Sequence, residues 1–164
     1  MTLAEAAAQA DGLAQERAER ELAQLRSQWD EELEAAARSS DYRERAVAYR
    51  AVGQFRFRQK LELLRRGLED ESPACRGSAL LALELLSRDH PGAVNAERPL
   101  LHRLISDGEE NPAVRRLAVM SLKNGSSQRD TIVILEGLAA DEEADRELRA
   151  AAKRVGELLK KKGR

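Results

Sequence analysis

The side chains that most often carry out catalysis or bind metals are scarce in this chain. It has two histidines, His90 and His102, and one cysteine, Cys75. Neither histidine has a second histidine or a cysteine at the spacing that a zinc site requires. A single cysteine cannot form a disulfide within the chain, and a buried thiol stays neutral, so Cys75 is predicted to be a core residue. We therefore expect no catalytic residue, no metal site and no cofactor.

Carboxylates gather in three short acidic stretches, at 69–71, 107–110 and 141–143. Each stretch precedes a run of helix-forming residues, where negative charge interacts favourably with the positive end of the helix dipole. A metal-binding loop is the alternative, but the sequence DGEENP lacks the alternating ligands of a calcium loop. A structural role is therefore favoured.

One short pattern recurs four times, and each copy is marked by an arginine followed three residues later by an alanine. The pairs are Arg45 and Ala48, Arg76 and Ala79, Arg115 and Ala118, and Arg149 and Ala152. The arginines are 31, 39 and 34 positions apart. A period of this length is typical of a solenoid of helical repeats, in which small residues let neighbouring helices approach closely.

A shorter amphipathic helix is predicted before each of the last three copies, from the leucines and isoleucines of 61–68, 101–105 and 134–138. The repeated unit is therefore a helix, an acidic turn and a second helix. Residues 87–99 explain the widest interval, because Pro91, Gly92 and Pro99 predict an irregular loop there.

The first 38 residues are predicted to form one long helix or two collinear helices. Thr2 and Glu5 have the spacing of a capping box. Alanines dominate the apolar face before residue 20, so this part buries little. It is expected to fray as an extension at 1–20 or to pack on a second copy of the chain as a homodimer. Trp29 continues the leucine stripe that follows and is predicted to lie in the core.

The sequence from Asp70 to Leu83, DESPACRGSALLAL, resembles the HEAT repeat family, in particular the short HEAT-like repeats of the phycobilin-lyase type. A second copy of the same pattern lies at 112–122. The resemblance implies an all-α fold, a right-handed α-solenoid (α-α superhelix) of about four HEAT-like hairpins with a long N-terminal helix. It also implies that the aspartates of the acidic turns pair with the repeated arginines. The repeat domain is assigned to 21–160, with repeats at about 21–55, 56–88, 95–125 and 127–160, followed by a basic tail at 161–164.

Composition agrees with a helical protein and sets limits on its partners. Aromatic residues make up only 3% of the chain and charged residues 35%, with a formal net charge of −1. Such a chain has no overall field that attracts nucleic acid or an anionic membrane surface. The N-terminus lacks the pattern of a signal peptide, and no apolar run is long enough to span a bilayer. A cytoplasmic location is expected, with no membrane partner.

The concave face of such a solenoid is the expected binding surface. Turning about 100° per residue away from the core positions of each inner helix gives the candidates. They are Tyr49, Arg50, Leu80, Leu81, Glu84, Arg88, Arg116, Val119, Met120, Lys123, Lys153 and Arg154. The apolar members either form an exposed stripe edged by basic residues or wedge between adjacent helices, and both interpretations remain open.

The function predicted from these features is a non-catalytic scaffold that binds an acidic or amphipathic segment of another protein. One alternative is a phycobilin-lyase-like or chaperone subunit that handles a tetrapyrrole-bearing protein, which rests on the repeat subtype alone. Another is a DNA-binding HEAT protein. Such a protein needs a wide basic groove with aromatic side chains, and Tyr49 is the only aromatic residue of the groove predicted here. Nucleic acid is therefore not the expected partner.

Overall fold

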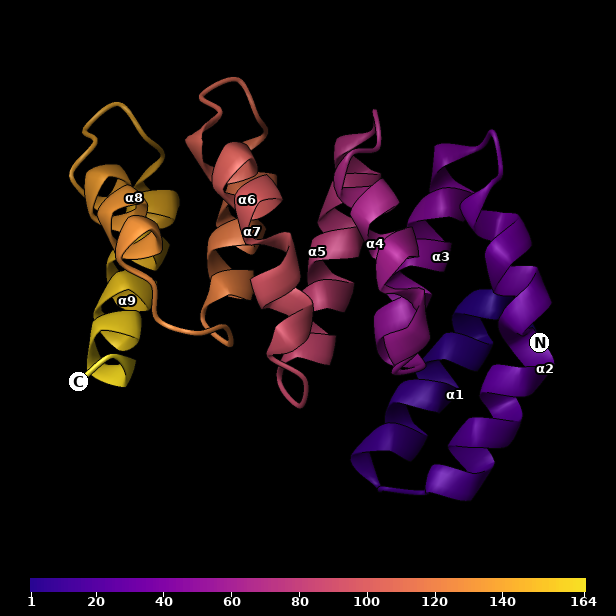
Figure 1. Ribbon diagram of the computed structural model, residues 1–164. Helices are drawn as coiled ribbons and strands as arrows, with labels where there is room; N and C mark the ends of the chain where they lie inside the picture. Colours follow the sequence, from indigo (N-terminus) through magenta and orange to yellow (C-terminus); the bar gives the residue numbers. More distant parts are fainter. The chain divides into compact units, whose positions relative to one another are not determined.

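The computed structural model describes all 164 residues, which form two compact units, residues 1–86 and 87–164. The chain is all-α, with nine α-helices, one short 3₁₀-helix and no strand. The first unit contains α1 (Leu3–Gln15), α2 (Glu19–Ala37), α3 (Tyr42–Gln54), η1 (Arg58–Lys60), α4 (Leu61–Leu68) and nearly all of α5 (Pro73–Ser87). The second contains α6 (Gly92–Ser106), α7 (Pro112–Leu122), α8 (Arg129–Ala139) and α9 (Arg146–Lys162) (Figure 1). The predicted α-solenoid class, built of helical hairpins, is confirmed.

The second helix of a hairpin, called the inner helix below, begins where the sequence places a capping residue. The side chains of Asp41, Asn111 and Asp145 accept hydrogen bonds from the amides that open α3, α7 and α9. Each cap satisfies one backbone donor that the helix itself leaves unpaired, which contributes about 1 kcal/mol. The predicted capping box of Thr2 and Glu5 is also present, at the start of α1.

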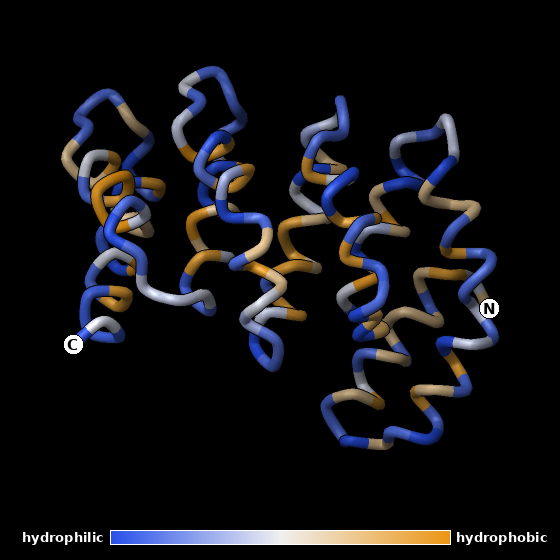
Figure 2. The backbone as a smooth tube through the Cα atoms, viewed as in Figure 1, coloured by the Kyte–Doolittle hydropathy of each residue, from blue (hydrophilic) through white to orange (hydrophobic).

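Small side chains let the helices of the first unit lie very close together. A Cβ atom on Gly53 of α3 would lie 2.5 Å from the Cα of Ala82 in α5. A Cβ on Gly67 of α4 would lie 2.8 Å from the Cβ of Ala79 and 3.0 Å from the ring of Tyr49. Figure 2 shows apolar segments inside the helices and hydrophilic residues at many of the turns. The backbones of α3, α4 and α5 therefore meet at contacts where no larger residue fits.

Leucines and isoleucines fill the core of the second unit. Helix α6 packs against α7, α8 against α9, and the two inner helices α7 and α9 against each other. The side chains of Leu101, Ile105, Leu135 and Leu148 are almost completely buried among them.

The N-terminal stretch differs from the prediction. It is neither one long helix nor two collinear ones, because α1 turns back at Arg17 and packs against both α2 and α3. Arg17 adopts a left-handed conformation with φ of 59°, which reverses the chain. The apolar face of α1, with Leu3, Ala6 and Ala10, is buried within the unit. The predicted fraying is therefore wrong, and the predicted homodimer loses the free apolar face on which it rested.

Residues 87–99 also differ from the prediction, since α6 begins at Gly92 and continues through Pro99. Pro91 has φ of −56°, which suits the residue before a helix, so it starts the helix instead of preventing it. Pro99 removes one backbone hydrogen bond from the interior of α6. Burial of Val94, Leu100 and Leu101 on both sides of the proline holds the helix together across that gap.

Replacing Gly53 by alanine should destabilise the chain, although alanine favours helix formation. The added methyl group would overlap the backbone at Ala82, and overpacking of this kind costs about 1–3 kcal/mol. Gly12→Ala in α1 is the matched control, because a Cβ there meets nothing within 4 Å and should stabilise by roughly 0.5–1 kcal/mol. The free energy of unfolding in urea measures both changes. Equal effects of the two substitutions would contradict the close approach of α3 and α5.

Candidate interaction surfaces

The first repeated arginine makes the carboxylate pair that the resemblance implied. Arg45 Nε lies 2.9 Å from Asp70 Oδ2, and Nη2 lies 3.0 Å from Oδ1, so the pairing is bidentate. Arg45 Nη1 also donates to the carbonyl oxygens of Ser39 and Ser40. Both charged side chains are largely buried, with 13% of Arg45 and 7% of Asp70 exposed. This pair joins α3 to the turn of the following hairpin.

The protonation of Asp70 reflects this environment. Burial disfavours its charged form, which raises its pKa, but the hydrogen bonds from Arg45 and from the Ser72 amide outweigh that effect. The net result is a pKa below the usual 3.8. The pKa of Arg45 is raised in turn, chiefly by its hydrogen bond to Asp70. The pair is therefore charged at neutral pH.

The next two repeated arginines donate hydrogen bonds to main-chain carbonyl oxygens. Arg76 Nη1 donates to the carbonyl oxygen of Asp70 at 2.7 Å. Arg115 donates through Nε and Nη2 to the carbonyl oxygen of Ile105, at 2.9 and 2.7 Å. The Nε of Arg149 is buried and has no hydrogen-bond partner. The predicted carboxylate pairing is therefore confirmed at the first arginine, whereas Arg115 binds a main-chain carbonyl and Arg149 has no acceptor for its Nε.

The apolar stripe predicted for the binding face is mostly buried. Tyr49 is 3% exposed, and Leu80 and Val119 are fully buried, so these three do not form an exposed stripe. Leu81 keeps 38% of its surface exposed and Met120 is half-buried. Because Tyr49 is buried, the DNA-binding alternative lacks the exposed aromatic side chain on which it relied.

The predicted polar candidates remain accessible to different degrees. Arg50 and Glu84 in the first unit and Arg116 and Lys123 in the second are half-buried, whereas Arg88, Lys153 and Arg154 are exposed.

Contacts within the second unit show that α7 and α9 run parallel. Arg116, near the start of α7, forms an ion pair with Glu147 at the start of α9. At the other end, Lys162 Nζ donates to the carbonyl oxygens of Lys123 and Gly125, at 2.6 and 3.0 Å. The structure therefore places the candidates of α7 and α9 on neighbouring parallel helices.

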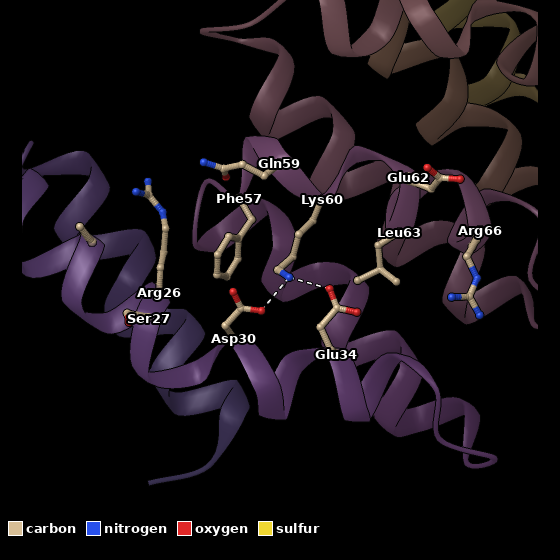
Figure 3. A pocket seen from close by; sticks show the side chains of 11 residues that line it. Arg26, Ser27, Asp30, Glu34, Phe57, Gln59, Lys60, Glu62, Leu63 and Arg66 are labelled. Atoms are coloured by element: carbon tan, nitrogen blue, oxygen red, sulfur yellow. Dashed lines mark hydrogen bonds and ion pairs between the residues drawn. The ribbon is translucent and has the colours of Figure 1, made fainter.

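The first unit also contains a cleft of about 620 Å³ between α2 and the segment formed by η1 and α4, which the sequence analysis did not predict. In Figure 3, Lys60 points from η1 towards two carboxylates of α2. Its Nζ lies 2.8 Å from Asp30 Oδ1 and 2.6 Å from Glu34 Oε1. The four-residue spacing of Asp30 and Glu34 marks one helix face, but nothing in the sequence indicates that Lys60 faces it.

The charges in this cleft are largely matched. Burial lowers the pKa of Lys60, yet the hydrogen bonds from it to Asp30 and Glu34 more than compensate, so the net shift is upward. Arg26 lines the same cleft and donates through Nε to the carbonyl oxygen of Phe55 at 2.6 Å. Desolvation lowers the pKa of Arg26. The ion pairs of Lys60 join α2 to η1.

Cys75 and His102, two of the residues considered for chemistry at the outset, make hydrogen bonds within the fold. Cys75 is fully buried, as predicted, and its Sγ donates to the carbonyl oxygen of Tyr42 at 3.2 Å. Burial raises the pKa of its thiol. His102 Nε2 lies 2.8 Å from Thr131 Oγ1, and Trp29 is 7% exposed, which confirms it as a core residue. No cluster of three or more His, Cys, Asp or Glu side chains could hold a metal ion. None of the helices has the length and apolar character needed to cross a membrane.

Removing one member of the Arg45–Asp70 pair should destabilise the first unit more than removing both. Arg45→Gln leaves a buried carboxylate without its cation and should lower the Tm by about 5 °C or more. The double variant Arg45→Gln with Asp70→Asn should melt at a higher temperature than Arg45→Gln alone. Thermal unfolding followed by circular dichroism measures this, with Arg43→Gln, an exposed arginine of α3, as the control. A double variant less stable than both single variants would contradict the buried pair.

Comparison with known proteins identifies the repeat. Residues 30–96 match the family model described as HEAT repeats, a range that runs from within α2 into α6. No curated protein and no solved structure is similar enough to the chain to count as a relative. The matched range contains Arg45, Arg76 and the Asp70 turn, which are the residues that carry the repeat pattern. Residues 30–96 are therefore similar to HEAT repeats.

Proposed function

We propose that this chain is a non-catalytic scaffold that binds an acidic segment of another protein along the inner helices of its second unit. HEAT repeats generally serve as protein-interaction scaffolds, because stacked helices offer long surfaces to a partner. The observation that carries the proposal is the excess of basic residues on the parallel helices α7 and α9.

Basic residues outnumber acidic residues on both of these helices. Helix α7 contains Arg115 and Arg116 and no acidic residue, and Lys123 ends it. Helix α9 carries seven arginines and lysines and two glutamates. Complementary charge speeds the encounter of two proteins and disfavours wrong partners. An acidic segment is therefore the partner that this surface fits best.

Met120 and Arg154 lie at equivalent positions of α7 and α9, each five residues after the repeated arginine. Met120 is half-buried and Arg154 exposed, so an apolar contact and a cation stand on neighbouring helices. Methionine adapts its shape to irregular surfaces, and arginine is enriched among the residues that dominate binding energy. These two positions are the proposed centre of the surface, with Arg116 and Lys123 at its edges.

Reversing the charge of Arg116 and Lys123 together should weaken partner binding at least about tenfold, since each substitution replaces an attraction by a repulsion. The measurement is an affinity pull-down from the native host, quantified by mass spectrometry, with the wild-type chain and the Arg116→Glu/Lys123→Glu variant as baits. Arg116→Glu also replaces the ion pair with Glu147 by a repulsion, but both of these side chains are exposed to solvent, so the variant should remain folded, which circular dichroism checks.

The control is Arg103→Glu with Arg129→Glu, which makes the same change in net charge on the exposed sides of α6 and α8. It should capture the same proteins as the wild type. An equal loss of captured partner with both double variants would show that only the net charge of the chain matters. Unchanged capture by the Arg116→Glu/Lys123→Glu variant would refute the proposed surface.

A further inference from the structure

A groove of about 680 Å³ lies in the first unit, where α2 ends and α1 and α3 begin. It is called the α1–α3 groove below. The apolar side chains that line it are mostly small, namely Leu3, Ala4, Ala35, Ala36 and Val47. Val47 keeps 36% of its surface exposed, and Ala4 and Ala35 are exposed as well. Alanines leave space between helices for larger side chains, so apolar groups of another molecule can pack beside Val47.

The charged residues of the same groove are mainly acidic. Glu32 and Glu44 line it, are exposed and form no ion pair shorter than 4 Å within the chain. Arg43 is the one cation of the lining, and its Nε is already paired with Asp41 Oδ1 at 3.2 Å. The groove therefore combines an apolar surface with two carboxylates for which the chain supplies no ion-pair partner.

This combination favours one class of occupant. A lysine or arginine beside an apolar side chain can pair with Glu32 or Glu44 while the apolar group packs on Val47, whereas an acidic segment would be repelled. A helix presents apolar side chains three and four residues apart with charged residues on either side of them. Such a helix can lie with its apolar side in a groove of this kind.

We infer that the α1–α3 groove binds an amphipathic helix of a partner protein, in which lysines or arginines flank the apolar side. The apolar side chains of that helix pack against Ala35, Ala36 and Val47. Its cations pair with Glu32 and Glu44.

This inference goes beyond the proposed function and does not rest on it. The proposed surface on α7 and α9 belongs to the second unit and is basic, whereas the α1–α3 groove belongs to the first unit and is acidic. Two surfaces of opposite charge on one scaffold select two different partners. The two proposals can therefore fail separately, and the Arg116→Glu/Lys123→Glu variant should bind a ligand of the groove as the wild type does.

The probe is a fluorescein-labelled amphipathic peptide of leucine and lysine, about 18 residues long, which is enough to form a helix. A second peptide has glutamate in place of every lysine. Each is titrated with the full chain and followed by fluorescence anisotropy. The lysine peptide should bind at least about tenfold more tightly than the glutamate peptide, because only its charges are complementary to the groove.

Two variants of the chain test the residues of the groove. Ala35→Arg should weaken binding of the lysine peptide at least about tenfold, because the long side chain occupies the groove and its cation repels lysine. Ala23→Arg is the matched control, since Ala23 is also an exposed alanine of α2 but does not line the groove. Arginine is a good helix former, so both variants should keep the wild-type Tm.

The carboxylates are tested separately. Glu32→Gln with Glu44→Gln should weaken binding of the lysine peptide about fivefold, as expected for the loss of two exposed ion pairs. Glu21→Gln with Glu31→Gln makes the same change in net charge at exposed positions of α2 outside the groove and should have no effect.

No measurable binding of the lysine peptide, or equal affinities for the two peptides, would overturn the inference. Equal effects of Ala35→Arg and Ala23→Arg, or of the two double variants, would also overturn it, because the peptide would then respond to net charge and not to the groove. Self-association of the chain in light scattering that Ala35→Arg abolishes would overturn it as well, since the occupant would then be a second copy and not a separate protein.

Discussion

Close contact between helices at glycine and alanine is the constraint on which the first unit depends. Alanines such as Ala48, Ala51, Ala79 and Ala82 fill much of its core, and side chains this small close the core only where helix backbones come together. Gly53 and Gly67 provide that contact on α3 and α4, where added methyl groups would overlap Ala82 and Ala79. The same approach brings the turn after α4 to the start of α3, so the backbone contact determines where Asp70 meets its arginine.

Local signals in the sequence predicted the helices well. Capping side chains act on amides two or three residues away, so Asp41, Asn111 and Asp145 could be recognised without knowledge of the fold. Two predictions, the straight N-terminal helix and the loop at 87–99, failed because no local signal determines the structure there. Arg17 adopts a left-handed conformation that arginine seldom takes, and Pro99 lies inside a helix that contacts around it stabilise. Tertiary packing determines both, and no pattern of neighbouring residues reports it.

The candidate surface was predicted in part, for a geometrical reason. Rotation about a helix axis gives the direction in which a side chain points, but it does not give the distance to the next helix. Tyr49, Leu80 and Val119 lie on the helix side predicted to be a binding surface and are nevertheless buried, and Gly67 of α4 lies against the ring of Tyr49. At the equivalent position of α9, Lys153 is exposed. The change from apolar residues to lysine at this repeat position is the sequence signal that could have separated the buried positions from the exposed one.

The four repeated arginines show how one residue type at one repeat position can meet different hydrogen-bond acceptors. A guanidinium has five donors and no acceptor, so its role depends on which acceptors the surrounding structure supplies. The Asp70 turn supplies a carboxylate to Arg45, and the end of α6 supplies a carbonyl oxygen to Arg115. Both side chains therefore make hydrogen bonds that stabilise the fold. Arg149 has the same donors on a helix whose exposed stripe is charged, and its Nε meets no acceptor within the chain. A repeat motif therefore indicates what an arginine can bind, and the surrounding structure decides which acceptor it meets.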